Sequence, residues 1–179
     1  MKRDVSPGTQ SVLRHWREAV PNDRLAHLVH DAAKGLRRSL QMRLAEQNVS
    51  FGHWTFLRIL WEQDGLTQAE LSAHAGVMEP TTFTALKAMQ RRGYIARRKQ
   101  PDNKKKIFIY LTPKGRALKG KLVPLALDVN RVAVKAAKPV DVASTRQLLL
   151  RMIENLAADE ASKMAAAGAR SGKTKGHKP

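Results

Sequence analysis

The sequence predicts a mainly α-helical chain that carries one small β-hairpin. Apolar residues recur at helical spacing through most of the 179 residues, with glycines and prolines between the periodic segments. Two short runs, 94–98 and 107–111, are rich in β-branched and aromatic residues and are joined by a lysine-rich turn. A pair of short helices is expected directly before these runs. Together these features predict a winged helix-turn-helix between long terminal helices.

The two helices of the pair have clear start and stop signals. Thr67 and Glu70 match a capping box, in which each side chain bonds the other residue's free amide, so the first helix begins there. Gly76 ends it, because glycine adopts the left-handed conformation at little cost. Pro80 suits the first turn of the second helix, expected over Thr81–Arg92.

The second helix is expected to bury one face and to present the other to a partner. Phe83, Leu86 and Met89 recur at three-residue steps and form the expected buried stripe. The opposite face carries short hydroxyls and one cation, which can approach a base edge or a phosphate. These residues are Thr81, Thr84 and Lys87.

The charge of the chain indicates a polyanionic partner. The formal net charge is +18 at pH 7, with an isoelectric point near 10.9. A solubility charge or a cationic tail would be the alternative explanation. Nine Lys or Arg residues between positions 65 and 111 stand against three acidic residues, which leaves +6 on the expected helix pair and hairpin. Double-stranded DNA is therefore the expected partner.

Amphipathic helices on both sides of the motif carry more apolar surface than a small DNA-binding unit can cover. A second copy of the chain would bury it, so we expect a homodimer; a monomer whose terminal helices pack together is the alternative. The expected organisation is a partly disordered N-terminal extension (1–21), an N-terminal dimerisation helix (22–50), a winged helix-turn-helix lobe (51–111), C-terminal dimerisation helices (112–161) and a disordered basic tail (162–179).

Several classes of protein are disfavoured. Cysteine is absent, which excludes disulfides, thiol nucleophiles and cysteine-bound zinc. Enzyme phosphate loops, nucleophile elbows and dinucleotide fingerprints are missing, so no enzyme and no cofactor are expected. His27 and His30 have a spacing that can ligate zinc, but ordinary histidines are favoured and no metal is expected. Without a long apolar run or an apolar leader, we expect a cytoplasmic protein and no membrane partner.

The motifs resemble the MarR family of bacterial transcription regulators over about Asn22 to Ala161. The most specific matches are the segments 66–72, 80–89, 93–97 and 101–106, the last closing on 111–115. The resemblance implies a dimeric, ligand-responsive regulator of the repressor type. It would bind a pseudo-palindromic operator and be released by a small aromatic or acidic effector. A constitutive architectural protein that coats DNA by charge is the rival, and the basic tail would suit it.

The expected DNA contacts lie on the helix pair and the wing. They are Thr67, Gln68, Met78, Pro80, Thr81, Thr82, Thr84, Lys87, Arg97, Lys104, Lys105 and Lys106. The family's wing usually carries Asp-Arg-Arg where this chain has Asn103, Lys104 and Lys105, so the resemblance makes Lys105 the minor-groove residue. Lysine keeps the attraction for phosphate but lacks the planar guanidinium, which leaves base-step selectivity open. The missing aspartate also removes a brace for the wing base near Arg97.

The resemblance further places the helix expected at 51–62 beside the effector pocket. His53, Trp54 and Arg58 on this helix are the candidate ligand-binding residues, with Arg58 available to a carboxylate. The alternatives are a core position for Trp54 and a solvated Arg58, or one that pairs with Glu62.

Overall fold

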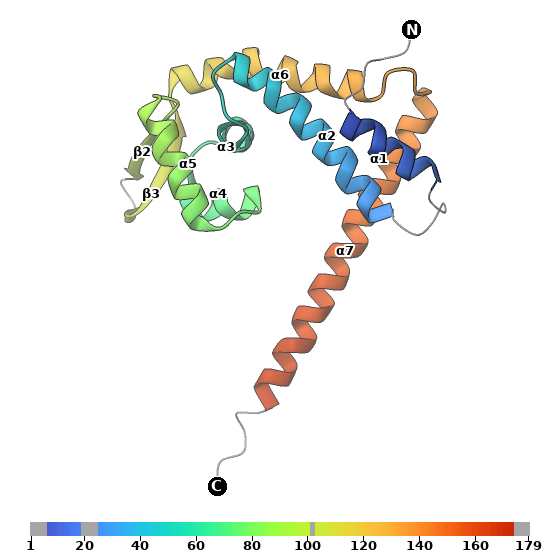
Figure 1. Cartoon of the computed structure of the whole chain (residues 1–179). Helices are drawn as coiled ribbons and strands as arrows, with labels where there is room; N and C mark the ends of the chain where they lie inside the picture. Colours follow the sequence, from blue (N-terminus) through green and yellow to red (C-terminus); the bar gives the residue numbers. More distant parts are fainter. Residues whose placement is uncertain (1–6, 19–24, 101–102, 174–179) are drawn as a thin grey trace. The chain divides into compact units, whose positions relative to one another are not determined.

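The computed structural model describes residues 7–18, 25–100 and 103–173 (Figure 1). The chain divides into two compact units, residues 1–133 and 134–179, which are described separately below. Expectations for residues 1–6, 19–24, 101–102 and 174–179 lie outside the described residues.

Before the helix pair, the described residues form α1 (Pro7–Glu18), α2 (Leu25–Glu46) and α3 (Phe51–Glu62). Helix α1 begins four residues before the helix expected from Ser11, because Pro7 fits a first helical turn, where an amide hydrogen is not needed. Helix α3 begins as expected, with the Ser50 side chain accepting a hydrogen bond from the amide of His53 at 3.2 Å.

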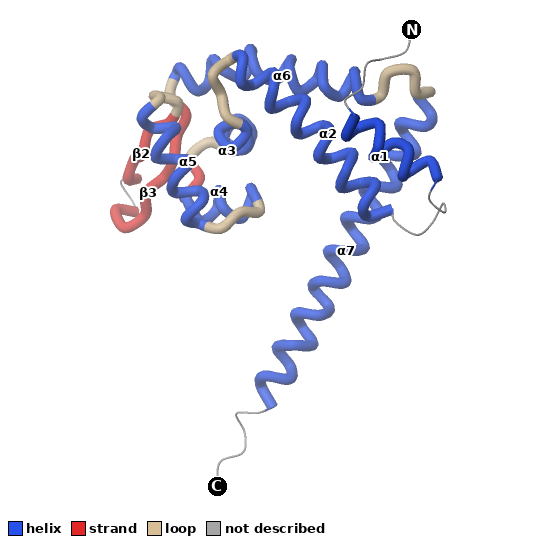
Figure 2. The backbone as a smooth tube through the Cα atoms, viewed as in Figure 1, coloured by secondary structure: helices blue, strands red, loops and turns tan. Residues whose placement is uncertain are grey.

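The winged helix-turn-helix follows as β1 (Leu66–Thr67), α4 (Gln68–Ala75), α5 (Glu79–Arg91), β2 (Ile95–Gln100) and β3 (Asn103–Leu111). The strands form an antiparallel sheet in the order β1-β3-β2. Figure 2 shows β2 and β3 side by side. The sequence did not predict β1, which exists because its two residues pair with Ile109 and Phe108 of β3. Both hairpin strands also extend beyond the predicted runs, since cross-strand pairing continues into the lysine-rich segment.

The core of unit 1 lies among α2, α3, α4, α5, the sheet and α6 (Pro113–Ala133). Its fully buried large side chains include Leu44, Leu57, Leu60, Leu71, Leu86, Met89, Ile109 and Leu122. Arg43 of α2 binds Asp128 of α6 at 2.9 Å, and Arg116 binds Asp64 at 2.7 Å. These pairs join the long helices to each other and α6 to the loop before β1.

Helix α6 begins where the hairpin ends, and the junction is tightly packed. The Thr112 side chain accepts a hydrogen bond from the Gly115 amide at 3.1 Å, and Trp61 Nε1 donates to the Gly115 carbonyl at 3.0 Å. A Cβ at Gly115 would lie 2.1 Å from the carbonyl oxygen of Tyr94. Only glycine therefore fits at this crossing of α6 and the wing.

Unit 2 contains the long helix α7 (Pro139–Lys173). The expectation of a disordered tail from residue 162 is wrong up to Lys173, because the alanine-rich segment has high helix propensity. Lys163 also binds Asp159 one helical turn earlier, at 2.6 Å. No helix among the described residues has the length and apolar character needed to cross a bilayer.

Candidate DNA interface

The capping box holds the start of the helix pair. The Glu70 carboxylate accepts hydrogen bonds from the amide and the hydroxyl of Thr67, both at 2.7 Å, and these bonds lower the pKa of Glu70. Gly76 adopts the left-handed conformation with φ 63°, as expected for the end of α4. Gln68 donates to Glu79 across the turn at 3.5 Å. Thr67 and Gln68 thus have partners within the helix pair, and their DNA contacts remain predictions.

Helix α5 presents the expected polar face. The side chains of Pro80, Thr81, Thr84 and Lys87 are exposed, and Met78 at the helix start is 78% exposed. The Thr84 hydroxyl donates to the Pro80 carbonyl at 3.0 Å, which fixes its orientation along the helix. These side chains form one surface that carries two hydroxyls, the Lys87 cation and the apolar Met78 side chain.

The buried face of α5 differs from the prediction by one residue. Thr82 is 0% exposed and its hydroxyl is hydrogen-bonded to that of Ser72 at 2.8 Å, so its side chain cannot reach DNA. Phe83, expected in the core, is instead 45% exposed. Thr82, Leu86 and Met89 make up the inward stripe, because Ser72 of α4 satisfies the buried hydroxyl.

The wing contributes cations beside this surface. Arg97 of β2 is half-buried and its Cζ lies 5.5 Å from the centre of the Phe83 ring. Lys106 is exposed on β3, three residues from the start of the strand, and contributes to the low pKa of Glu70, so this part of the wing lies near the start of α4. Lys104 and Lys105 lie in β3 towards the hairpin tip, and the structure describes their backbone only.

The structure does not bring the three ligand candidates together. Trp54 is only 7% exposed and packs edge-on against Trp61, with ring centres 5.7 Å apart, so it occupies the core as in the alternative interpretation. Arg58 and His53 line two different cavities. The two residues are five positions apart on α3, so their side chains point about 140° apart around the helix.

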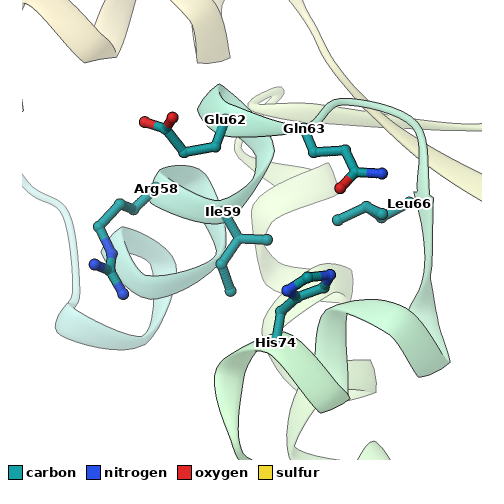
Figure 3. Close-up of a pocket in the computed structure, with 6 residues that line it drawn as sticks. All are labelled: Arg58, Ile59, Glu62, Gln63, Leu66 and His74. Carbon is teal, nitrogen blue, oxygen red and sulfur yellow. The ribbon is translucent and has the colours of Figure 1, made fainter. Parts of the chain in front are cut away.

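The first cavity, the α3–α4 pocket, has a volume of about 370 Å³. It is lined by Arg58, Ile59, Glu62, Gln63, Leu66 and His74 (Figure 3). Ile59, Leu66 and His74 point towards one another, whereas Arg58 and Glu62 extend away from them (Figure 3). The centre of this pocket is therefore mainly apolar, and its charged groups lie at the rim.

The second cavity, the α3–α5 groove, has a volume of about 590 Å³ and reaches the exposed face of α5. It is lined by Ser50, Gly52, His53, Pro80, Thr81, Thr84, Ala85 and Ala88. His53 is 8% exposed, and its Nδ1 is buried with no hydrogen-bond partner among the described residues. Burial, and then the charge of Arg92, lower the pKa of His53, so the imidazole is neutral near pH 7.

Comparison with known proteins identifies the domain. The sequence model of the MarR family matches residues 49–107, which include α3, the helix pair and most of the hairpin. The chain is therefore similar to the MarR family over this segment. MarR-family proteins are transcription regulators rather than enzymes, as the sequence predicted.

Curated MarR-family relatives are similar at low identity. The transcriptional regulator TtmR of Methylorubrum extorquens is 29% identical over 101 residues, 56% of this chain but only 52% of TtmR, so the match spans about half of that relative. The organic hydroperoxide resistance regulator of Bacillus subtilis is 22% identical over 134 residues, covering 75% and 90% of the two chains. The repressor Rv2887 of Mycobacterium tuberculosis is 28% identical over 137 residues, covering 75% and 94%.

Solved MarR-family structures share the fold. The transcriptional regulator SlyA superposes with a TM-score of 0.69 at 24% identity, covering 76% of this chain and 96% of SlyA. A MarR-family regulator from Listeria monocytogenes in complex with 26mer DNA gives 0.69 at 23% identity, covering 76% and 91%. The winged helix-turn-helix architecture predicted from the sequence is therefore confirmed.

Two features of this site were not predicted from the sequence. The position of Phe83 at the surface and the unpaired Nδ1 of His53 both depend on tertiary packing. Among the described residues, no group of three His, Asp or Glu side chains is arranged to hold a metal.

Proposed function

We propose that this chain is a homodimeric, ligand-responsive repressor that binds a pseudo-palindromic DNA operator and is released by a small aromatic or acidic effector. The observation that carries the proposal is the exposed face of α5, where Thr81, Thr84 and Lys87 lie beside a basic hairpin. A helix with short hydroxyls and one cation fits the major groove, where base edges carry distinct hydrogen-bonding patterns.

The wing supplies the complementary contact in this proposal. Lys104, Lys105 and Lys106 lie on β3 and would reach the phosphates or the minor groove that flanks the α5 contact. Lys105 is the proposed groove residue. The remaining proposed contacts are those predicted from the sequence, without the side chain of Thr82.

The proposed dimer rests on apolar side chains left exposed on the terminal helices. They are Leu25, Leu28, Leu36 and Met42 on α2, Leu127 and Val132 on α6, and Val140, Leu148, Leu149, Leu150, Ile153, Leu156 and Met164 on α7. A second copy would remove this surface from water. Two-fold symmetry would then place two α5 helices on paired half-sites, which is the reason for expecting a palindrome.

The proposed effector site is the α3–α5 groove. An acid or phenol bound there would lie against the apolar wall of Ala85 and Ala88, beside the largely buried His53 ring. The occupant would also cover Thr81 and Thr84, which the proposal assigns to DNA, so effector and operator would compete. One solved relative, BpsR of Bordetella bronchiseptica, has its DNA binding regulated by 6-hydroxynicotinic acid.

The rival is a protein that coats DNA without sequence preference or effector control, and one experiment separates the two. The protein selects duplexes from a random pool, and the affinity for the selected duplex is compared with that for bulk DNA. The repressor should prefer its own site by about three decades or more. Addition of aromatic acids, screened first by thermal shift, should then release it. Equal affinity for both DNAs would support the coating protein. Action on chromosomal DNA would place the repressor in the cytoplasm.

A further inference from the structure

Three helix ends of unit 1 meet at Arg92, the residue that caps the C-terminal end of α5. Its side-chain Nη1 donates a hydrogen bond at 3.0 Å to the carbonyl of Asn48, two residues beyond the end of α2. Its backbone carbonyl accepts a hydrogen bond at 2.9 Å from Lys114 Nζ in the first turn of α6. These two bonds, the Arg92 junction, join α5 directly to both long helices of the unit.

The partners of Arg92 are held in place on both sides. Asn48 has the left-handed φ of 57°, and its amide donates to the Ala45 carbonyl in the last turn of α2 at 2.9 Å. This turn places the Asn48 carbonyl outside the helix, where it accepts from Arg92. Lys114 Nζ also lies 5.3 Å from the centre of the buried Tyr94 ring, so a cation–π contact holds the lysine.

The two long helices are tied to each other and carry part of the proposed dimer surface. Arg43 of α2 binds Asp128 of α6 at 2.9 Å. Exposed apolar side chains on the same helices, among them Leu36 and Leu127, are those assigned above to contact with a second copy. A path from the proposed interface to α5 therefore runs along α2 and α6 and ends at the Arg92 junction.

We propose that Arg92 and Lys114 are positioning residues that fix α5 against the dimerisation helices and so set the half-site spacing that the dimer accepts; this inference rests on the proposed dimeric, operator-binding function. Neither side chain needs to touch DNA for this role. One base pair added between two half-sites moves one of them by about 3.4 Å and turns it by about 35° around the duplex. A dimer in which α5 is fixed can follow this change only by breaking the junction.

The strength of the junction limits its effect. Both hydrogen bonds have a charged donor and a backbone carbonyl acceptor, and both are exposed to water. A dimer on the wrong spacing can break the bond in one protomer, so each bond contributes no more than its own net free energy to the preference. Removal of one donor should therefore reduce the preference for the correct spacing by about three- to tenfold.

The test uses duplexes that carry the half-sites selected by the wild-type protein from a random pool, with the selected spacing and with one base pair more or fewer. The ratio of affinities between the selected and the altered spacings is the readout. For the wild type this ratio should be at least about tenfold. Arg92→Met and Lys114→Met remove the donors but retain most of the aliphatic stems, and each should reduce the ratio by about three- to tenfold.

Arg91→Met is the matched control. Arg91 is the neighbouring residue on α5, is exposed and carries the same charge, but its side chain points about 100° away from that of Arg92 around the helix. This variant should leave the ratio unchanged, whatever its effect on the affinity itself. An equal reduction of the ratio by Arg91→Met would show a general charge effect and overturn the positioning role.

The same readout separates positioning from folding and from direct contact with DNA. Each ratio comes from one protein preparation, so a fraction of unfolded protein cancels, and thermal unfolding checks each variant. An equal loss of affinity on all spacings in Arg92→Met and Lys114→Met would overturn the proposal, because a phosphate contact acts regardless of spacing. A wild type that selects no paired half-sites would refute the proposed dimeric function itself. A selected pair of half-sites on which both variants keep the wild-type ratio would refute only the positioning role.

Discussion

The hydroxyl groups of Ser72 and Thr82 are hydrogen-bonded at 2.8 Å in the buried seam between α4 and α5. Ser72 Oγ also lies 2.9 Å from the Gln68 carbonyl oxygen, so both hydroxyls are satisfied inside the protein. This link fixes the rotation of α5 about its axis. It turns Thr82 inwards and leaves Thr81 and Thr84 facing outwards.

Loss of one partner in this seam should be costly. Ser72→Ala should lower the free energy of unfolding by about 1–3 kcal/mol, because the buried Thr82 hydroxyl loses its partner. Ser72→Ala combined with Thr82→Val should cost less than the sum of the two single changes. Urea denaturation measures the free energy of unfolding of the single and double variants. As a control, Ser162→Ala at an exposed position should change this free energy by no more than about 0.5 kcal/mol. If the stability losses of Ser72→Ala and Thr82→Val were strictly additive, the two hydroxyls would not be coupled.

Thr84→Val tests whether α5 reads bases. The change removes one hydroxyl while retaining the shape of the side chain, so it should alter discrimination between operator variants more than non-specific affinity. Lys87→Gln should instead weaken binding to all sequences to a similar degree, since phosphate contacts carry no sequence information. Binding isotherms on a panel of single-base variants decide the matter. A uniform loss for Thr84→Val would mean that this residue touches only the backbone.

Lys105→Ala tests the wing. Loss of one phosphate contact per protomer should reduce the salt slope by roughly two units per dimer and weaken binding at low salt. Lys119→Ala removes the same charge from an exposed position on α6 and should leave the slope unchanged. Lys105→Arg should tighten binding only at A·T-rich flanks, since arginine prefers narrow minor grooves. An unchanged slope for Lys105→Ala would leave the wing without a DNA contact.

The proposed dimer can be broken on α7. Ile153 and Leu156 are 65% and 66% exposed in the single chain, and glutamate at both positions would place charge in the proposed interface. The double variant should sediment as a monomer and lose operator affinity, whereas Ser162→Glu, on the opposite side of α7 from Ile153, should remain dimeric. A monomeric wild-type protein would contradict the proposal directly.

His53 should make stability depend on pH. Its pKa is lowered from the ordinary value of 6.5 by burial and by Arg92, so below that pH the unfolded chain takes up a proton first. The free energy of unfolding should therefore fall as the pH drops below about 6.5, until the folded-state pKa is passed. His53→Gln should lose less stability than the wild type between about pH 7 and about pH 5 in urea titrations. If the wild type and His53→Gln lost stability equally as the pH fell, other titratable groups would be responsible.

Locally encoded features of this chain were predictable from sequence. The capping box of Thr67 and Glu70 and the left-handed Gly76 depend on residues within a few positions of each other. Helix boundaries in the DNA-binding lobe followed from these signals. The hairpin followed from its β-branched and aromatic composition, and the charge balance then indicated DNA.

Features set by distant partners were not predictable. Spacings of 82/86/89 and 83/86/89 are both helical, and the hydrogen bond from Ser72, ten residues away, favours the first. The two-residue strand β1 requires β3, and the cavities that His53 and Arg58 line depend on which helices cover each side of α3. The extent of α7 was underestimated because a basic, alanine-rich composition was interpreted as disorder.

Gly115 has a consequence for how this protein can vary. Its Cα faces the Tyr94 carbonyl so closely that even a methyl group would overlap it, while its own carbonyl accepts the Trp61 hydrogen bond. Glycine is required here by the close approach of two backbone segments, and not by any contact with DNA or effector. In a saturation library, selection for any operator or any inducer should return glycine here alone, whereas the exposed threonines of α5 should diverge with the selecting sequence.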